Sequence, residues 1–321
     1  MTNLEKYTRL IEEALQGLTL PQEPANLYDP LRYFMTLGGK RMRPILTLLA
    51  TEACGKNAEE GLKAALAVEL FHNFSLIHDD IMDAAPLRRG MSTVHEKWNA
   101  NIAILSGDVL LVEAYACLGN YAPNSFKQLF ETFNRTAKEV CEGQQMDMDF
   151  EQLYDVSEDQ YLEMIRLKTS VLLGCALEMG AIIGDASPAD AAHLYHFGEQ
   201  LGLAFQIQDD LLDLYGNSAQ VGKQIGGDVL ADKKTLLSIA AHNLADENQK
   251  IALKELATIQ EPELKVKLAQ ELYTQIGGKN YCQTKMETYH NAALNALNEL
   301  QNMSSKAAFF ELADFLLMRK Y

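Results

Sequence analysis

The amino-acid sequence predicts an all-α protein made of one large helical domain, for three reasons. Only eight of the 321 residues are proline, and after Pro44 the stretches without proline are 36 residues or longer, which leaves room for long helices. No segment alternates apolar and polar residues beside a hairpin dipeptide, so strands are not expected. Helix start signals are present: Ser157 with Gln160 and Thr93 with Glu96 as capping boxes, and Ser187 followed by Pro188.

The helices are expected in chain order, separated by loops that are rich in glycine or polar residues. The most loop-like segments are 38–39, 84–91 and 216–232. No linker is long enough to separate two folding units, so residues 1–321 are expected to form a single domain. The expected helices cover residues 4–17, 42–54, 58–84, 99–120, 124–150, 158–184, 188–215, 233–246, 263–276, 283–301 and 304–318.

The composition excludes several classes of protein. With 28 Lys plus Arg against 44 Asp plus Glu the net charge is −16, so a nucleic-acid binder that relies on overall positive charge is not expected. The longest apolar stretch, 171–184, contains Glu178 and is shorter than the roughly 20 residues that cross a bilayer, so no membrane span is expected. A polar stretch over residues 1–9 and five cysteines without a C-x-x-C pair favour a cytoplasmic location.

Two segments, 79–83 and 209–213, both read D-D-x-x-D within apolar surroundings. In a helix, residues four apart lie on one face, so the first and fifth positions of each motif should form an acidic ridge. Two facing ridges would repel each other unless cations lay between them, and carboxylate oxygens favour Mg²⁺ or Ca²⁺. Because Mg²⁺ in proteins is usually bound by one or two carboxylates together with substrate phosphates, a diphosphate between the ridges is expected. Alternatively, each motif is only an acidic, solvated helix end.

Basic residues gather close to both acidic motifs in the sequence. Arginine binds phosphate oxygens bidentately and lysine acts as a point charge, so this pattern favours a phosphate site in an otherwise acidic chain. The alternative is that the basic side chains are solvated surface. The clusters are Lys40, Arg41 and Arg43 after Gly38-Gly39, Arg88 and Arg89 after the first motif, and Lys223, Lys233 and Lys234 after the second.

On these motifs, nearly the whole chain resembles the trans-isoprenyl diphosphate synthases, also called polyprenyl synthetases. The resemblance implies the isoprenoid synthase fold, an all-helical homodimer in which each chain surrounds a central cavity. It also implies isopentenyl diphosphate and an allylic diphosphate as substrates, and Mg²⁺ as cofactor with three ions per active site. The segments that carry the resemblance are 38–44, 72–83, 88–90, 168–169, 205–213 and 223–233.

The resemblance further implies a role for each matching residue. The metal ligands would be Asp79, Asp80, Asp83, Asp209, Asp210 and Asp213. The residues that bind substrate would be Lys40, Arg43, His72 and Arg89 for isopentenyl diphosphate and Arg88 for the allylic diphosphate. The remaining catalytic positions of the allylic site would be Lys168, Thr169, Gln206, Lys223 and Lys233.

These residue types suit the reaction that the resemblance implies. Mg²⁺, lysine and arginine stabilise a departing diphosphate, so that the C–O bond can ionise to an allylic cation. Gln206 and the Thr169 hydroxyl can offer dipoles to that cation. The double bond of isopentenyl diphosphate then attacks, and the proton is expected to go to the released diphosphate, so no dedicated protein base is expected.

Residues that precede Asp79 in its helix are expected to set the product length, because a growing isoprenoid would extend along that helix. Ser75 is small, whereas Phe74 is bulky and could close the floor about 7 Å below the motif, with Phe71 deeper still. In the family, an aromatic residue at the Phe74 position without an insertion in the first motif resembles the twenty-carbon type. The expected product is geranylgeranyl diphosphate, with farnesyl diphosphate as the alternative; Phe74 could instead be ordinary core packing.

The sequence suggests three alternative functions. A terpene cyclase would share the fold and the first acidic motif but would lack the isopentenyl diphosphate residues. A ferritin-like di-metal bundle is suggested by the Glu-x-x-His patterns at 69–72 and 287–290, but it needs two further inward glutamates. A regulatory subunit without catalysis would be expected to have degraded aspartate motifs, and here both are intact.

Overall fold

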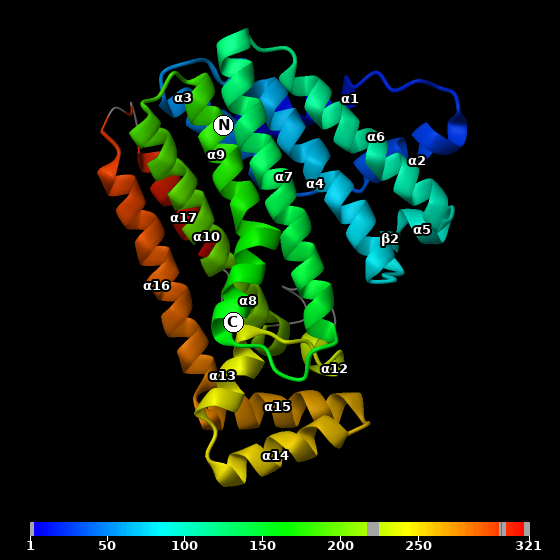
Figure 1. Cartoon of the computed structure of the whole chain (residues 1–321), viewed down its shortest axis with the longest axis vertical. Helices are drawn as coiled ribbons and strands as arrows, with labels where there is room; N and C mark the ends of the chain where they lie inside the picture. Colours follow the sequence, from blue (N-terminus) through cyan, green and yellow to red (C-terminus); the bar gives the residue numbers. More distant parts are fainter. Residues whose placement is uncertain (1–2, 217–224, 302, 304–305, 318–321) are drawn as a thin grey trace. The chain divides into compact units, whose positions relative to one another are not determined.

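The computed structural model describes residues 3–216, 225–301, 303 and 306–317. Over this part of the chain the secondary structure is helical except for one hairpin of two-residue strands, so the predicted all-α fold is confirmed (Figure 1). Two compact units are present. The first comprises residues up to 137 together with 175–194 and 301–305, and the second comprises 138–174, 195–300 and the residues from 306 onward. The single domain over 1–321 stays a prediction.

The first unit contains the N-terminal helices and parts of α7, α9 and α10. Its longest complete helices, α4 and α6, lie side by side (Figure 1). The short hairpin follows the C-terminal end of α4 and pairs Leu87 with Ser92 and Arg88 with Met91. The elements are α1 (Asn3–Gln16), α2 (Ala25–Thr36), α3 (Met42–Ala53), the 3₁₀ turn η1 (Ala58–Gly61), α4 (Leu62–Met82), β1 (Leu87–Arg88), β2 (Met91–Ser92), α5 (Val94–Lys97) and α6 (Ala100–Leu118).

The hairpin and α2 differ from the sequence-based expectation. Helix α2 contains Pro30, which lacks the N–H of a helix interior, and a proline inside a pattern argues against a helix. Leu31 and Phe34 nevertheless bury one face of α2, so packing offsets the loss. The capping box predicted at Thr93 is wrong: the Thr93 side chain does not cap α5, and its hydroxyl donates to the Ala85 carbonyl (2.8 Å) instead.

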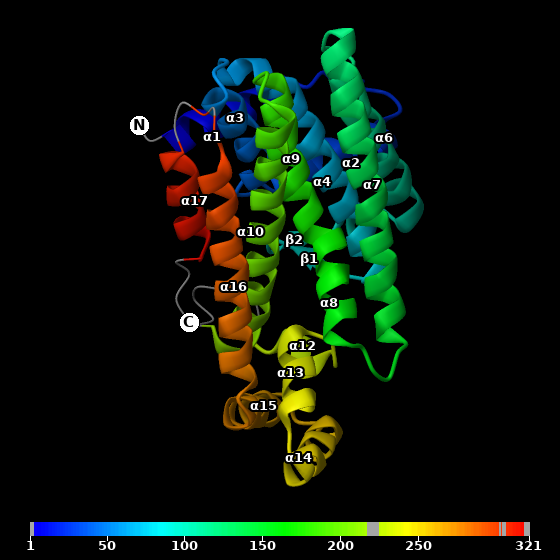
Figure 2. The ribbon, with the colours of Figure 1, turned by 60° about the vertical axis from the view of Figure 1, so that its left-hand side comes forward.

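The second unit contains the C-terminal helices. Helices α12 to α15 gather near the beginning of α16 (Figure 2). Buried leucines of α10 and α13 form a shared core with Tyr161. The elements, several of which also contribute residues to the first unit, are α7 (Pro123–Glu151), α8 (Glu158–Ile165), the π turn η2 (Arg166–Ser170), α9 (Val171–Ile183), α10 (Pro188–Tyr215), α12 (Gly227–Leu230), α13 (Leu236–Leu244), α14 (Glu247–Thr258), α15 (Pro262–Ile276), α16 (Gly278–Glu299) and α17 (Ala307–Leu317).

Two of the predicted helix starts are confirmed. The Ser157 hydroxyl accepts a hydrogen bond from the Gln160 N–H, and the Gln160 side-chain oxygen accepts one from the Ser157 N–H, which completes the capping box of α8. Ser187 likewise accepts from the Asp190 N–H (3.1 Å) just before α10 begins at Pro188. The helix predicted over 158–184 is interrupted by the π turn, which apolar periodicity does not reveal.

Among the described helices, α6 alone is long and apolar enough to cross a membrane by length and composition. This is weak evidence for a span, because core helices of soluble proteins pass the same test. Ala103, Leu110 and Leu118 of α6 are buried within the first unit, where the helix lies against α4 and α2. Its apolar composition therefore serves, at least in part, to pack this unit.

Candidate active site

The first acidic motif lies at the C-terminal end of α4. The helix ends at Met82, and Asp83 keeps a helical backbone and donates its N–H to the Asp79 carbonyl (2.9 Å). Asp79 and Asp83 are therefore separated by one helical turn, as their spacing predicts. The negative end of a helix dipole disfavours carboxylates, so this position increases the need for a nearby cation.

Arg88 supplies one such cation from the hairpin. Its Nε lies 2.9 and 2.8 Å from the two carboxylate oxygens of Asp80, and its Nη2 lies 2.7 Å from Oδ1. The same guanidinium is 3.7 Å from Asp79 Oδ2. Burial raises the pKa of Asp80, which is 2% exposed, and Arg88 opposes that effect. The hairpin thus holds an arginine directly against the motif.

Three residues predicted to bind isopentenyl diphosphate come together in the first unit. Arg43 Nη1 lies 3.2 Å from His72 Nε2, and burial lowers the Arg43 pKa to about 10. Burial and the neighbouring Arg43 lower the His72 pKa well below its usual range, so this imidazole is neutral. Arg89 lies beside the Gly38-Gly39 loop: a Cβ on Gly39 would be 3.0 Å from its Nη2. Lys40 is exposed next to this glycine.

A buried ion pair that the sequence did not reveal lies among these arginines. Arg41 Nη1 is 2.6 Å from Glu69 Oε1, and Arg41 Nε is 2.8 Å from Glu12 Oε1. Arg41 was grouped with the phosphate-binding cations, yet its side chain is buried and already paired. Burial raises the pKa of Glu69, while attraction to Arg41, Arg43 and Arg89 opposes it. Glu69 is therefore the internal counter-charge of the cluster, which also argues against the ferritin-like alternative.

The second acidic motif lies in α10 of the second unit. Asp210 is buried, and its carboxylate accepts hydrogen bonds from Tyr161 (2.5 Å) and from the Gln206 amide (3.3 Å). Burial raises the Asp210 pKa to about 8, against the effect of the Tyr161 bond. Asp213 accepts from the Asp228 N–H (3.1 Å), which ties the motif to the start of α12.

The raised pKa makes stability depend on pH. In the metal-free folded protein Asp210 holds its proton up to about pH 8, whereas an unfolded chain releases it near pH 4. Between these values the folded state binds the extra proton, so the free energy of unfolding should fall as the pH rises. An Asp210→Asn variant should flatten this fall, as measured by urea unfolding in EDTA at pH 5.5 and 8. Equal slopes in Asp210→Asn and in the exposed control Asp155→Asn would contradict the expectation.

The π turn carries Lys168 and Thr169. The Lys168 ammonium lies 2.5 Å from Asp147 Oδ2 on α7, and the Thr169 hydroxyl lies 3.4 Å from Gln206 Oε1. Thr169 is thus connected to Asp210 through the Gln206 side chain, whereas Lys168 is paired with a carboxylate of α7. A π turn re-aims side chains within a helix and is frequent at functional sites.

Two glycines allow neighbouring helices to approach this turn. A Cβ on Gly143 of α7 would lie 2.3 Å from the Lys168 backbone nitrogen. A Cβ on Gly202 of α10 would lie 2.7 Å from Ser170 Cα. The turn is therefore held by direct backbone packing, and Gly143 and Asp147 are one helical turn apart on α7.

The other predicted lysines follow the second motif. The Lys233 side chain is exposed, and its backbone N–H donates to the Asp228 carbonyl (2.9 Å). Lys223 falls outside the described residues. Asp209 and Asp213 are partly exposed in α10. The two acidic motifs belong to different units, so their facing each other across a central cavity stays a prediction.

The predicted chain-length residues lie in α4 within an aromatic cluster. The Phe74 ring centroid is 4.6 Å from that of His78 and 5.6 Å from that of Phe71. Phe71 is fully buried and packs edge-on against Phe133, as a core residue does. The Ser75 hydroxyl donates to the His72 carbonyl (2.8 Å), which occupies its polar group within the helix.

The donor set of the first motif fits a divalent metal that keeps water and phosphate ligands. Asp79 and Asp83 offer hard oxygen atoms one turn apart, and Mg²⁺ is usually held by one or two carboxylates plus substrate phosphates. Within the described residues, no three His, Cys, Asp or Glu side chains converge to hold a metal by themselves. The two carboxylates one turn apart suit a metal that also takes phosphate ligands.

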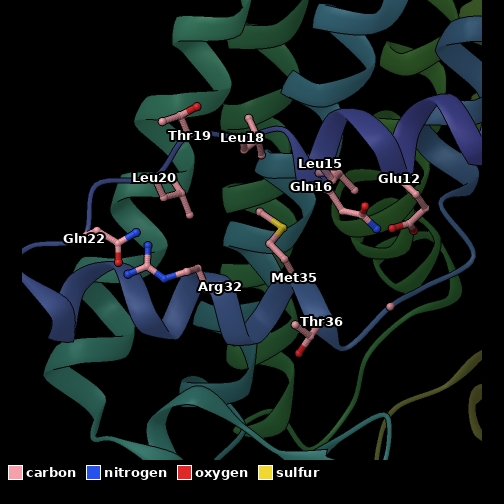
Figure 3. A pocket seen from close by; sticks show the side chains of 11 residues that line it. Glu12, Leu15, Gln16, Leu18, Thr19, Leu20, Gln22, Arg32, Met35 and Thr36 are labelled. Carbon is pink, nitrogen blue, oxygen red and sulfur yellow. The ribbon is translucent and has the colours of Figure 1, made fainter.

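A separate cavity of about 640 Å³ lies in the first unit between α1, α2 and the segment joining them (Figure 3). Leu15, Leu20 and Met35 line its apolar part. Arg32 and Gln22 lie at one end, whereas Glu12 of the Arg41 ion pair lies at the other. No residue predicted for catalysis lines this cavity, although Gly38, in the loop beside Arg89, does.

Comparisons with known proteins identify the family of the chain. Residues 24–276 match the polyprenyl synthetase family. A geranylgeranyl diphosphate synthase of Methanosarcina mazei is 38% identical over 97% of this chain and 95% of its own length. A geranylfarnesyl diphosphate synthase of Natronomonas pharaonis is 33% identical over 97% and 95%. A solved geranylgeranyl pyrophosphate synthase superposes with a TM-score of 0.92 at 43% identity, covering 99% of this chain and 98% of that one. The predicted resemblance is confirmed, and the chain belongs to the polyprenyl synthetase family.

Proposed function

We propose that the protein is a short-chain prenyltransferase that condenses isopentenyl diphosphate with an allylic diphosphate and makes geranylgeranyl diphosphate. The observation that carries the proposal is the group formed by Arg43, neutral His72 and Arg89 beside the first acidic motif. Such a group binds a diphosphate close to carboxylates that can hold a divalent ion. The names of the relatives support the same substrate class and favour the twenty-carbon product.

Each motif has its own role in the proposed reaction. Bound Mg²⁺, at three ions per active site, would neutralise charge on the departing diphosphate. Arg88 would move from Asp80 to diphosphate oxygens, while Lys40, Arg43 and Arg89 hold isopentenyl diphosphate. The residues proposed to hold the metal are Asp79, Asp80, Asp83, Asp209, Asp210 and Asp213.

The π turn would serve the allylic cation. Asp147 fixes the Lys168 ammonium, which would contact the allylic diphosphate, and the Thr169 hydroxyl and Gln206 amide would turn their oxygen dipoles toward the cation. Lys223 and Lys233 would add positive charge for the same diphosphate. The proton lost after attack would go to the released diphosphate, so none of these residues needs to act as a base.

The direct test is incubation of the purified protein with labelled isopentenyl diphosphate, Mg²⁺ and each starter separately. Dimethylallyl, geranyl and farnesyl diphosphate are the starters, and the dephosphorylated products are sized by chromatography. A twenty-carbon alcohol from all three supports the proposal. A fifteen-carbon end product would favour the farnesyl alternative, and a cyclic hydrocarbon would favour a terpene cyclase.

Phe74 is proposed to limit the chain length, with small Ser75 above it. Phe74→Ala should open space along α4, so the main product should lengthen by at least one five-carbon unit. Chromatographic sizing measures this, with Tyr154→Ala, an aromatic residue that is 94% exposed, as the control. An unchanged product spectrum would mean that Phe74 is only a packing partner of Phe71 and His78.

We further propose that the protein acts as a cytoplasmic homodimer. Ile104, Leu105 and Val112 expose apolar side chains on α6, and Phe126 and Phe130 do so on α7 of the same unit. A patch of this kind on one unit is typical of a surface that another subunit covers. A second copy is the simplest partner, since cyclic dimers are the commonest oligomers.

A further inference from the structure

The β1–β2 hairpin carries two arginines of the proposed site but has little core of its own. Its strands are two residues long, and Leu87 and Met91 are 59% and 51% exposed. An isolated two-stranded hairpin is marginally stable in water. The positions of Arg88 and Arg89 must therefore depend on contacts that the hairpin makes with its surroundings.

The base of the hairpin is closed by Thr93. This fully buried residue donates its hydroxyl to the Ala85 carbonyl (2.8 Å) and its N–H to the Pro86 carbonyl (3.2 Å). Arg88 on the first strand is anchored separately by Asp80. Arg89 forms no ion pair with any residue that the structure describes, so its direction depends on how the hairpin is held.

Tyr33 of α2 holds the second strand. Its hydroxyl donates to the Ser92 carbonyl (2.7 Å). Its ring is fixed from two sides, because the Lys97 ammonium lies 3.6 Å from the ring centroid and the Trp98 ring packs edge-on at 5.4 Å. Lys97 and Trp98 follow the hairpin directly in the chain, so Tyr33 contacts the segment on both sides of Thr93.

Helix α2, which carries Tyr33, also leads into the Gly38-Gly39 loop of the site. Helix α2 ends at Thr36, and Gly39 in the following loop approaches the Arg89 guanidinium closely. A rigid α2 thus connects the segment that begins at Gly38 with the strand that follows Arg89. Tyr33 is the hydrogen-bonding residue that joins the two.

We propose that Tyr33 is a positioning residue for isopentenyl diphosphate, because it holds the hairpin so that Arg89 lies beside the loop that leads to Arg43. This inference rests on the proposed function. It assigns Tyr33 a role in binding one substrate, and it requires no contact between Tyr33 and that substrate. Because Asp80 orients Arg88 separately before the allylic diphosphate binds, binding of that substrate should be affected less.

The test is Tyr33→Phe, which removes one hydroxyl and keeps the ring. A hydrogen bond of this kind contributes about 0.5–1.5 kcal/mol, so the KM for isopentenyl diphosphate should rise about two- to twelvefold. The kcat and the KM for the allylic substrate should change less than about twofold, since kcat depends on groups that Tyr33 does not touch. Tyr28→Phe, on the same helix, is the matched control and should behave as the wild type.

A second measurement separates this inference from the proposed function. Calorimetric titration with isopentenyl diphosphate alone should show the same weakening in Tyr33→Phe as the KM does, with a thermal midpoint lowered by no more than about 4 °C. Lys97→Met, which keeps an apolar side chain over the ring, should weaken binding in the same direction but less. Two results would overturn the inference and leave the proposed function standing. In the first, the wild type and Tyr33→Phe bind isopentenyl diphosphate equally well. In the second, kcat of Tyr33→Phe falls in parallel with a lowered thermal midpoint. If the wild type binds none, both fail.

Discussion

An Asp79→Ala variant is expected to lose turnover by at least about 10²–10³-fold while its stability stays the same or rises slightly. The loss follows because the carboxylate would no longer hold a cation against charge that develops on the diphosphate. The effect on stability is small because the substitution relieves repulsion at the negative end of α4 and loses only the 3.7 Å contact of Asp79 with Arg88. Initial rates with saturating substrates and urea unfolding without metal measure the two effects separately.

Asp209→Ala should lose turnover by a similar factor, since the second motif is proposed to hold the same kind of ion. Asp155→Ala is the matched control, because Asp155 is an exposed carboxylate outside both motifs and should retain wild-type rates. Circular dichroism checks that each variant keeps its helix content. Near-normal turnover in Asp79→Ala would refute the proposed metal-binding role of the first motif.

A Gly143→Ala variant is expected to be less stable by about 1–3 kcal/mol and to lose kcat by about 100-fold. The new methyl group would lie 2.3 Å from the Lys168 nitrogen and 2.7 Å from the Leu167 carbonyl carbon, and backbone atoms cannot move aside cheaply. The π turn would have to shift, and with it Lys168 and Thr169. In an unstrained helix the same substitution would add up to about 1 kcal/mol of stability, so the sign of the change identifies the clash.

Gly119→Ala provides the control for this experiment. Gly119 follows α6 with a φ of −62° that alanine readily adopts, and the nearest atom to an added Cβ is 3.4 Å away. This variant should keep its stability and its kcat. Loss of stability without loss of kcat in Gly143→Ala would show that the close packing supports the fold but does not aim Lys168.

Proline spacing, apolar periodicity and capping signals predicted most of the helices. They did not predict the helices whose stability comes from packing or from a less obvious cap. Helix α2 was missed because Pro30 argues against a helix, whereas buried Leu31 and Phe34 stabilise it. Helix α14 was missed although Asp246 and Gln249 form a capping box at its start, a signal that the sequence does contain. The hairpin has two-residue strands, too short for any alternation to appear.

The candidate site was predictable where charge itself carries the information. Repeated aspartates and clustered arginines point to a metal and a phosphate, whatever surrounds them. Their partners were not predictable, because Glu69, Asp147 and Tyr161 are brought close by tertiary packing. The same limit applies to Thr93. Its sequence context predicts that the hydroxyl caps α5, but in the folded chain it donates to the Ala85 carbonyl at the base of the hairpin.

The π turn also has a consequence for how this helix must be compared between relatives. A five-residue repeat of hydrogen bonds accommodates one more residue than an α-helical turn, so residues 166–170 behave as a single-residue insertion inside a longer helix. Deleting one residue there would restore regular α-helical winding and leave the flanking helical segments in phase, so only the side chains of the turn itself would point in new directions. A relative that lacks the extra residue could keep a lysine and a threonine at the positions of Lys168 and Thr169 and still point their side chains elsewhere. Sequence identity at these positions is therefore informative only when the insertion is shared.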